Sequence, residues 1–274
     1  MPLRDKYRRR IASIRSRGPS AVAYSGGVDS TLLLRAAKDA LHDGMIALTA
    51  DLPYMARGEL HKAKVTARSL SARHRTVEIP FPESIRFNPE ERCYLCKKHL
   101  FTILIGEAAR AGCPVMLEGT NAEDLDDVRP GIRALRELGV VSPLLEAGFT
   151  KEDIRAVSKT LELPTWHTPA GSCLLTRLPH GREVTGEELE RIEKSEEHLF
   201  DLGFRAVRVR SHGDIARIEF ARGDRKKVFN EILMDAISRH LKFLGYRHVT
   251  MELEGYTRGG MSATDDAVPR EKRD

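Results

Sequence analysis

The chain lacks several features that would place a protein in a familiar class. No apolar run approaches the ~18 residues that a membrane-spanning helix needs, so the sequence predicts no membrane segment. Four cysteines among 274 residues are too few for a disulfide framework and favour a reducing compartment. Neither G-x-x-x-x-G-K-[ST] nor G-x-G-x-x-G occurs, which excludes the Walker loop and the dinucleotide fingerprint. We therefore expect a soluble, cytoplasmic protein of one large or two modest domains.

Positive charge is concentrated at one end of the chain. The formal net charge is +5, whereas residues 1–18 alone carry seven basic side chains and one acidic one, which leaves the rest slightly acidic. Together with an aromatic content of 6%, this argues against a nucleic-acid-binding surface. Tyr7, Ile11 and Ile14 fall on one helical face, so we expect a packed N-terminal helix; an Arg-rich transit peptide is the alternative.

A glycine-rich turn lies between the apolar run Ala21–Tyr24 and the helical segment 31–37. Adjacent glycines permit positive φ and a close approach of the backbone to a ligand. The following helix directs free N–H groups and the positive end of its dipole to the same place, and a carboxylate there calls for a cation such as Mg²⁺. The sequence thus predicts a phosphate and Mg²⁺ site made by Ser25, Gly26, Gly27, Val28, Asp29 and Ser30.

Strands and helices alternate in the first part of the chain, which predicts an α/β fold with a parallel sheet covered on both faces. After the first strand we expect strands at 45–50, 76–79, 115–120 and, shorter, 140–144, with helices at 57–73 and 150–163. Ligands bind such a sheet at the carboxyl ends of its strands. The glycine-rich turn, Asp51 and Gly119-Thr120-Asn121 should therefore meet there.

The pattern changes near residue 180, where a second, smaller α+β domain is expected to begin. It should contain a charged helix, a β-hairpin, a second helix and a last strand, at 185–202, 206–210 with 215–220, 225–243 and 247–254. We place the domain boundaries at 1–179 and 180–256. Residues 257–274 are polar, with four basic and four acidic side chains, and are expected to be a disordered tail.

A second group of reactive residues consists of cysteines. Cys93 and Cys96 form a C-x-x-C, which can place two thiolates on one metal or cluster, although a structural zinc half-site or chance gives the same pattern. Cys173 lies in a loop rich in Pro, Gly and Ser. Cys113 begins an expected strand and reads as a core residue. The histidines near them in sequence read as surface or hydrogen-bonding groups: His99, His167 and His180.

Two levels of resemblance follow from these motifs. Ser25–Ser30 resembles the PP-loop, S-G-G-x-D-S, of the ATP pyrophosphatases, which cleave ATP between the α and β phosphates. The whole set resembles the LarE sulfur transferases of nickel-pincer nucleotide cofactor biosynthesis, over about residues 5 to 255. The motifs that carry this resemblance are Ser25–Ser30, Arg92–Lys97, Glu118–Asn121, Pro169–Leu174 and Arg208–Arg210.

The resemblance implies an activity and its cofactors. A carboxylate of pyridinium-3,5-biscarboxylate mononucleotide would be adenylated by ATP with Mg²⁺ and then converted to a thiocarboxylate. Family members with one cysteine at the position of Cys173 sacrifice its sulfur, whereas those with a C-x-x-C as well are taken to hold a [4Fe-4S] cluster. This sequence has all three cysteines and resembles the cluster type, with Cys93, Cys96 and Cys173 as ligands and the sulfur donor unspecified.

The resemblance also assigns roles to residues and domains. Residues 1–179 would bind ATP and the cluster, and residues 180–256 would serve the substrate and a homo-oligomer. Arg208 and Arg210, two apart on a strand, would face the same way and hold the substrate phosphate. Glu196 is a further pocket candidate. Cys173, Asp29 and Glu219 are the expected catalytic residues, and the nucleotide would be bound by Ser25, Gly26, Gly27, Val28, Asp29, Ser30, Thr49, Gly119 and Asn121.

Three other hypotheses stay open. A tRNA thiolation enzyme also combines a PP-loop, a C-x-x-C and a later cysteine, but the body of this chain is not basic. A synthetase of the NAD or GMP type would explain the PP-loop and leave the cysteines unused. A nucleotide sensor without catalysis would need only the fold. Co-purification of tRNA tests the first hypothesis, and iron and sulfide content tests the other two.

Overall fold

The structure is a computed structural model that describes residues 3–125, 130–169, 171–204 and 206–256. The chain forms two compact units, which we describe separately. The first unit comprises residues 1–85 and 91–171, and the second comprises residues 86–90 and the chain from Ser172 onward. The change of unit thus falls at Ser172, before the boundary expected near 180, and Cys173 belongs to the second unit. The expected disordered tail, 257–274, lies outside the described residues.

The first unit is built on a four-stranded sheet with the order β3-β2-β1-β4. Its strands are β1 Ser20–Ala23, β2 Met45–Asp51, β3 His74–Glu78 and β4 Val115–Leu117. All three pairings are parallel, with Ser20 opposite Met45 on one side and Val115 on the other. The predicted parallel α/β fold is confirmed. The chain runs outward from β1 to β3 and returns to the far side of β1, so the switch point lies between β1 and β4.

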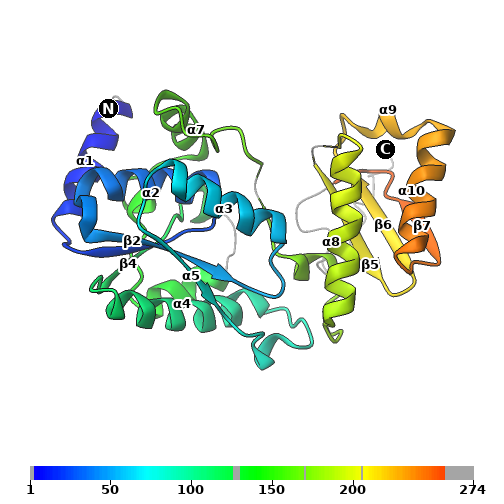
Figure 1. The fold of residues 1–274 in the computed structure, drawn as a ribbon, viewed down its shortest axis with the longest axis horizontal. Helices are drawn as coiled ribbons and strands as arrows, with labels where there is room; N and C mark the ends of the chain where they lie inside the picture. Colours follow the sequence, from blue (N-terminus) through cyan, green and yellow to red (C-terminus); the bar gives the residue numbers. More distant parts are fainter. Residues whose placement is uncertain (1–2, 126–129, 170, 205, 257–274) are drawn as a thin grey trace, which may run out of the picture. The chain divides into compact units, whose positions relative to one another are not determined.

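Helices cover both faces of this sheet, as parallel strands require. Helices α1, α2, α3 and α7 lie on one side and α4 and α5 on the other (Figure 1). The bounds are α1 Leu3–Arg15, α2 Val28–Leu41, α3 Arg57–Ser69, α4 Arg92–Arg110, α5 Pro130–Glu137, α6 Pro143–Glu146 and α7 Lys151–Thr160. No helix in the described ranges is both long and apolar enough to cross a membrane.

The N-terminal helix α1 packs against the first unit as expected, with Tyr7 and Ile14 buried. Three cations at this end of the chain are paired with acidic groups of the same unit. Lys6 contacts Asp153 at 2.5 Å, and Arg10 and Arg17 both contact Glu146, at 3.1 and 2.6 Å. Part of the basic charge at this end of the chain therefore serves packing.

The prediction of a strand at residues 140–144 is wrong. Only one bridge forms there, between Val141 and Leu117, and Pro143 then begins α6. Proline has no N–H for a strand ladder but suits the first turn of a helix, which explains the switch. Helix α4 was not predicted, because the C-x-x-C and a mixed pattern of polar and apolar residues obscured its helical period.

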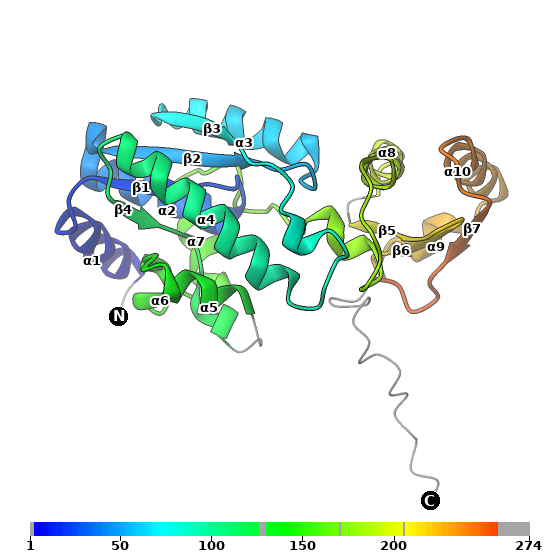
Figure 2. The same ribbon diagram turned by 90° about the horizontal axis from the view of Figure 1, so that it is seen from below.

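The second unit has an antiparallel hairpin, β5 Val207–His212 and β6 Ile215–Phe220, and β7 His248–Met251, which pairs in parallel with β6. Helices α8 Gly186–Asp201 and α10 Glu231–Phe243 lie on the same side of this sheet (Figure 2). The core contains Leu199, Phe204, Val209, Ile218, Phe220, Ile237 and Leu241. The helix expected at 225–243 is divided into α9 Arg225–Val228 and α10, because Asn230 caps α10 through a 3.0 Å bond from the amide of Leu233.

Candidate active site

The glycine-rich turn connects β1 to α2 in the geometry that the sequence predicted. Gly26 has φ +79°, and a Cβ atom there would lie 2.9 Å from the Cβ of Ala63, so backbone angle and space both call for glycine. Gly27 is the N-cap of α2 and offers no side-chain cap. The first amides of α2 therefore remain available for an anion. The hydroxyls of Ser25 and Ser30 lie 3.1 Å apart beside them.

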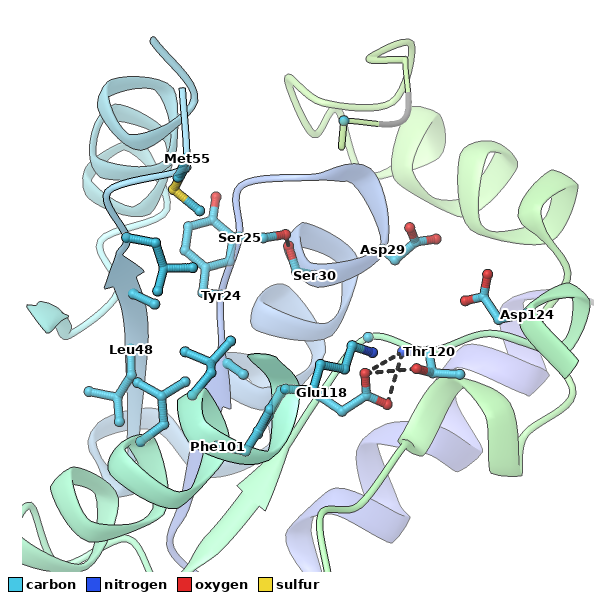
Figure 3. A pocket seen from close by; sticks show the side chains of 18 residues that line it. Tyr24, Ser25, Asp29, Ser30, Leu48, Met55, Phe101, Glu118, Thr120 and Asp124 are labelled. Atoms are coloured by element: carbon cyan, nitrogen blue, oxygen red, sulfur yellow. Dashed lines mark hydrogen bonds between the residues drawn. The ribbon is translucent and has the colours of Figure 1, made fainter. Parts of the chain in front are cut away.

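A cavity of about 420 Å³ opens at the carboxyl ends of the strands in the first unit (Figure 3). In that view Leu48, Met55 and Phe101 lie on one side, and Asp29, Thr120 and Asp124 lie on the other. The apolar part of the lining comprises Leu48, Ala50, Leu52, Met55, Leu100, Phe101 and Leu104. The polar part comprises Ser25, Asp29, Ser30, Lys97, Glu118, Thr120 and Asp124. A ligand with an apolar ring at one end and charged groups at the other would match this lining.

The turn after β4 approaches the start of α2 closely. A Cβ atom on Gly119 would lie 3.1 Å from the amide nitrogen of Ser30, so the contact favours glycine. Glu118 is buried, and its carboxylate accepts hydrogen bonds from the amide of Thr120 at 3.1 Å and from its hydroxyl at 2.8 Å. Asn121, also buried, donates to Asp29 at 3.4 Å. The two turns expected to meet at this edge of the sheet do so, whereas Asp51, expected with them, is not among the residues that line the cavity and forms an ion pair with Arg57.

Lys151 is a functional candidate that the sequence did not indicate. It is the first residue of α7, where Thr150 and Asp153 form a capping box, and its Nζ atom contacts the carboxylate of Asp29. The capping box identified the start of the helix but not what that start would face. Lys97 and Asp124 were likewise missed, because only the folded sheet brings their segments to the cavity.

Thr49 is placed differently from the other expected nucleotide contacts. It is fully buried, and its hydroxyl donates to the carbonyl of Tyr24 at 2.7 Å and lies 2.8 Å from His74 Nε2. Its neighbours in β2, Leu48 and Ala50, line the cavity, so the Thr49 side chain points to the opposite face of the strand. Only its backbone is left to contact a nucleotide in the cavity.

The cysteines are distributed over both units. Cys93 and Cys96 lie three residues apart near the start of α4, on the same side of the helix, and Cys93 is exposed. The Tyr54 hydroxyl lies 3.0 Å from Cys96 Sγ. Cys173 is half-buried in the second unit. Within the described part of the chain, no three His, Cys, Asp or Glu side chains are grouped so that they could hold a metal ion.

Cys113 differs from the other three thiols. It is buried just before β4, and burial raises the pKa of its thiol. A protonated, enclosed sulfur is a poor nucleophile and a poor metal ligand. The fourth cysteine is therefore suited to packing.

Two buried ion pairs organise the hairpin of the second unit. Arg210 and Glu219 form a bidentate pair at 2.9 and 2.8 Å, and Arg210 also donates to the carbonyl of Thr176 at 2.6 Å. Arg177 and Glu196 form a second bidentate pair, with both contacts at 2.9 Å. All four charged side chains are at least nine-tenths buried. The expected phosphate-binding edge of Arg210 is therefore occupied by a carboxylate of its own chain.

Arg208 is in a different electrostatic position from Arg210. Its Nη1 donates to the carbonyl of Val207 at 2.8 Å, and its guanidinium lies 5.2 Å from the ring centroid of Tyr256, but its buried Nε has no hydrogen-bond partner among the described residues. Burial, and next the nearby Arg177, lower the pKa of Arg208. No ion pair joins Arg208 to an acidic side chain in the described chain. A half-buried guanidinium of this kind would gain from an anionic ligand.

No protein-family model matches this chain. Comparison with individual known proteins, however, finds relatives that align over nearly its full length. The chain is 36% identical over 259 residues to pyridinium-3,5-bisthiocarboxylic acid mononucleotide synthase of Lactiplantibacillus plantarum, covering 93% of this chain and 92% of that one. It is 37% identical over 243 residues to an uncharacterized Synechocystis protein, covering 88% and 91%.

A more distant match supports the assignment of the first unit. One subunit of the glutamine-hydrolyzing GMP synthase of Thermoplasma acidophilum is 27% identical over 197 residues, covering 65% of this chain and 62% of that one. This match agrees with a PP-loop domain of the ATP pyrophosphatase type. Given the near full-length match to the Lactiplantibacillus synthase, the chain belongs to the LarE family of PP-loop sulfur transferases.

Proposed function

We propose that the protein is an ATP-dependent sulfur transferase that adenylates a carboxylate of pyridinium-3,5-biscarboxylate mononucleotide and converts it to a thiocarboxylate. The observation that carries the proposal is the cavity at the PP-loop, whose lining combines apolar side chains with charged and polar ones. The near full-length similarity to a synthase named for the bisthiocarboxylic acid mononucleotide supports the substrate. The second unit would recognise that substrate.

ATP would lie along the cavity with its adenine against the apolar wall. The amides of Gly26, Gly27 and Val28 and the hydroxyls of Ser25 and Ser30 would hold the β and γ phosphates, because these groups converge at the start of α2. Gly119 and Asn121 would support the loop from the end of β4. Lys151 would move from Asp29 to the phosphates, where it adds a positive charge.

Mg²⁺ suits the carboxylates in this lining, since hard cations prefer oxygen ligands. Asp29 and Asp124 both line the polar side of the cavity and would hold it. When bound, Mg²⁺ supplies charge neutralisation for the departing pyrophosphate. A substrate carboxylate oxygen forms a bond to the α phosphorus, and the bond from that phosphorus to the bridging oxygen breaks, so pyrophosphate leaves with the electron pair.

The donor set of the three accessible cysteines fits a [4Fe-4S] cluster. Cys93 is exposed, Cys96 and Cys173 are partly exposed, and the first two lie near the start of α4. Three protein ligands would leave one iron without a protein ligand. When bound, such a cluster would supply the sulfide that displaces AMP from the acyl-adenylate, forming a C–S bond as the C–O bond breaks.

Arg208 is the residue best suited to the phosphate of the substrate. Its half-buried guanidinium has an unsatisfied Nε and no carboxylate partner among the described residues. Arg210 and Glu219 would not contact the substrate themselves. Their ion pair would hold the strand that carries Arg208 in position. The catalytic role expected for Glu219 would then be one of positioning. Glu196, paired with Arg177, would have a similar role.

The test is product analysis with anaerobically purified protein, ATP, Mg²⁺ and the biscarboxylate mononucleotide. We expect AMP and pyrophosphate in equal amounts, loss of both in Asp29→Ala, and iron and acid-labile sulfide in the purified protein. ADP and phosphate as products would contradict the proposal. If only Cys173 were needed, and the protein lost the mass of H₂S after one turnover, its own sulfur would be the source.

A further inference from the structure

Asn88 is a fully buried polar residue to which the proposed function gives no role. It lies in the segment 86–90, which is part of the second unit. Its φ is +46°, in the left-handed region that asparagine adopts more readily than most residues. Its Oδ1 atom is buried and has no hydrogen-bond partner among the described residues. An unsatisfied buried atom on a backbone of this kind costs stability, so the presence of this residue calls for an explanation.

The amide group of Asn88 holds the turn that follows Cys173. Its Nδ2 atom donates to the carbonyl groups of Leu175, Leu178 and Pro179, at 3.2, 3.0 and 3.0 Å. Leu175 belongs to the short helix η4 Leu174–Arg177, and the other two residues follow directly on that helix. Because a backbone carbonyl can accept only from a donor, the three contacts require the amide N–H groups of asparagine. One buried side chain therefore fixes the main chain at three points after Cys173.

Arg177 holds the same turn at the level of Cys173 itself. Its Nη1 atom donates to the carbonyl groups of Ser172 and Cys173, at 2.9 and 3.0 Å, and the Arg177 side chain is buried. The Cys173 carbonyl also accepts from the amide and the hydroxyl of Thr176, at 3.1 and 2.9 Å. The main chain at Cys173 is thus held by several bonds, while its side chain is partly exposed. The turn presents the sulfur atom from a backbone with little freedom to move.

We propose that Asn88 is a positioning residue for Cys173, which keeps the sulfur of this cysteine in the place where it serves sulfur transfer. The inference rests on the proposed function and holds for both of its routes, since Cys173 is either a cluster ligand or the source of the sulfur. A displacement of about 1 Å at a reacting group can slow a reaction about 100-fold. Adenylation of the substrate uses the PP-loop of the first unit instead. Loss of the Asn88 amide should therefore separate the two half-reactions.

The first experiment measures thiocarboxylate formed per AMP released, with ATP, Mg²⁺, the biscarboxylate mononucleotide and sulfide under anaerobic conditions. Asn88→Gly removes the amide group and keeps a residue that adopts positive φ. We expect this ratio to fall about tenfold or more while AMP release continues. An acyl-adenylate that meets no sulfur is hydrolysed, since a water oxygen bonds to the acyl carbon as AMP leaves. Glu162→Gly, at an exposed residue with φ +53°, is the matched control and should keep the ratio of the wild type.

The ratio separates positioning from a purely structural role, because it does not depend on the folded fraction. An unchanged ratio in Asn88→Gly, or a parallel loss of AMP and thiocarboxylate, would overturn the proposal. A wild type that releases no AMP would instead refute the proposed function. The second experiment then decides on Asn88 by itself.

The second experiment measures how fast iodoacetamide alkylates each cysteine of the full chain after iron has been removed. Peptide mass spectrometry reads Cys173 and Cys113 in the same sample. In Asn88→Gly the alkylation of Cys173 should become several-fold faster, because the released turn exposes more of its sulfur. Cys113 is buried in the first unit and should react as slowly as in the wild type. Equal rates at Cys173 in the two proteins, or an equal acceleration at Cys113, would show that Asn88 does not position this cysteine.

Discussion

The ammonium group of Lys151 contacts the carboxylate of Asp29, which joins the start of α7 to the PP-loop. The two residues are 122 positions apart in the chain. The contact holds a cation at the point where the first amides of α2 are directed. An incoming polyphosphate would find the positive charge in place, and Asp29 would then be free for Mg²⁺.

Replacing Lys151 by Ala should weaken ATP binding or turnover by about 1.5–3 kcal/mol, the range for hydrogen bonds to charged groups. Lys159→Ala is the control, since that lysine is on the same helix but lies over the ring of Trp166. Steady-state measurement of AMP release as a function of ATP concentration tests the difference. Equal kinetic constants for the two variants would show that Lys151 does not contribute to ATP binding or turnover.

Serine substitutions of single cysteines should separate the thiols into two classes. Cys93→Ser, Cys96→Ser and Cys173→Ser should each lose iron, acid-labile sulfide and visible absorbance. Cys113→Ser should keep all three and lose some stability, because its sulfur is buried in the first unit. Iron and sulfide contents of each variant, measured after anaerobic reconstitution, distinguish the two classes. Retention of iron in the Cys173 variant would show that the cluster is not built as proposed.

Tyr54→Phe should leave the fold intact but loosen the cluster. The ring is buried, and its edge-to-face contact with Phe81 would survive, whereas the hydroxyl that lies 3.0 Å from Cys96 Sγ would be lost. Hydrogen bonds to the sulfurs tune the reduction potential of a cluster and its retention. We expect a lower potential and faster iron loss to a chelator. Values matching the wild type would mean that the contact has no influence on the metal.

Arg208→Ala and Arg210→Ala should fail in different ways. The first should weaken mononucleotide binding by about 1.5–3 kcal/mol and leave unfolding unchanged. The second leaves Glu219 buried without its bidentate partner, and breaking a buried pair in this way costs about 3–5 kcal/mol of stability. Calorimetric titration of the mononucleotide and urea unfolding distinguish the two. Loss of binding in the Arg210 variant at full stability would restore the direct role expected from the sequence.

A salt titration extends this test to the nucleic-acid hypothesis. Binding of one phosphate depends mainly on Arg208, whereas tRNA binding would spread over many contacts, fall steeply with salt and respond to removal of residues 1–18. Insensitivity to Arg208→Ala together with a strong effect of the truncation would favour tRNA as the substrate.

The stability of the second unit should depend on the protonation of His198. Its ring stacks on His240 with centroids 3.7 Å apart, and burial, then the charge of His240, lower the pKa of His198, while Asp201 opposes the shift. The folded state therefore binds fewer protons than the unfolded state, and stability is lost as the pH falls through the ordinary histidine pKa of about 6.5. His198→Gln should lose less stability than wild type between neutral and mildly acidic pH. Urea unfolding at several pH values tests this, and equal losses would contradict it.

The sequence by itself determined the elements whose signals are local. The PP-loop follows from a strand, two glycines and a helix start within a few residues, and the parallel sheet follows from the alternation of apolar strands with helices. The capping box at Thr150 likewise fixed the start of α7. Such signals depend on backbone conformation and period, which neighbouring residues impose on each other.

The tertiary structure decided which distant groups meet. The strand order brings Gly119 and Lys151 to the PP-loop. In the hairpin, Glu219 lies opposite Arg208 in the strand register but forms its ion pair diagonally with Arg210, which leaves Arg208 without a carboxylate. Both arginines occupy equivalent positions in the period-two pattern, so periodicity could not separate them. Their difference comes from packing, because Glu219 on the neighbouring strand reaches one guanidinium and not the other.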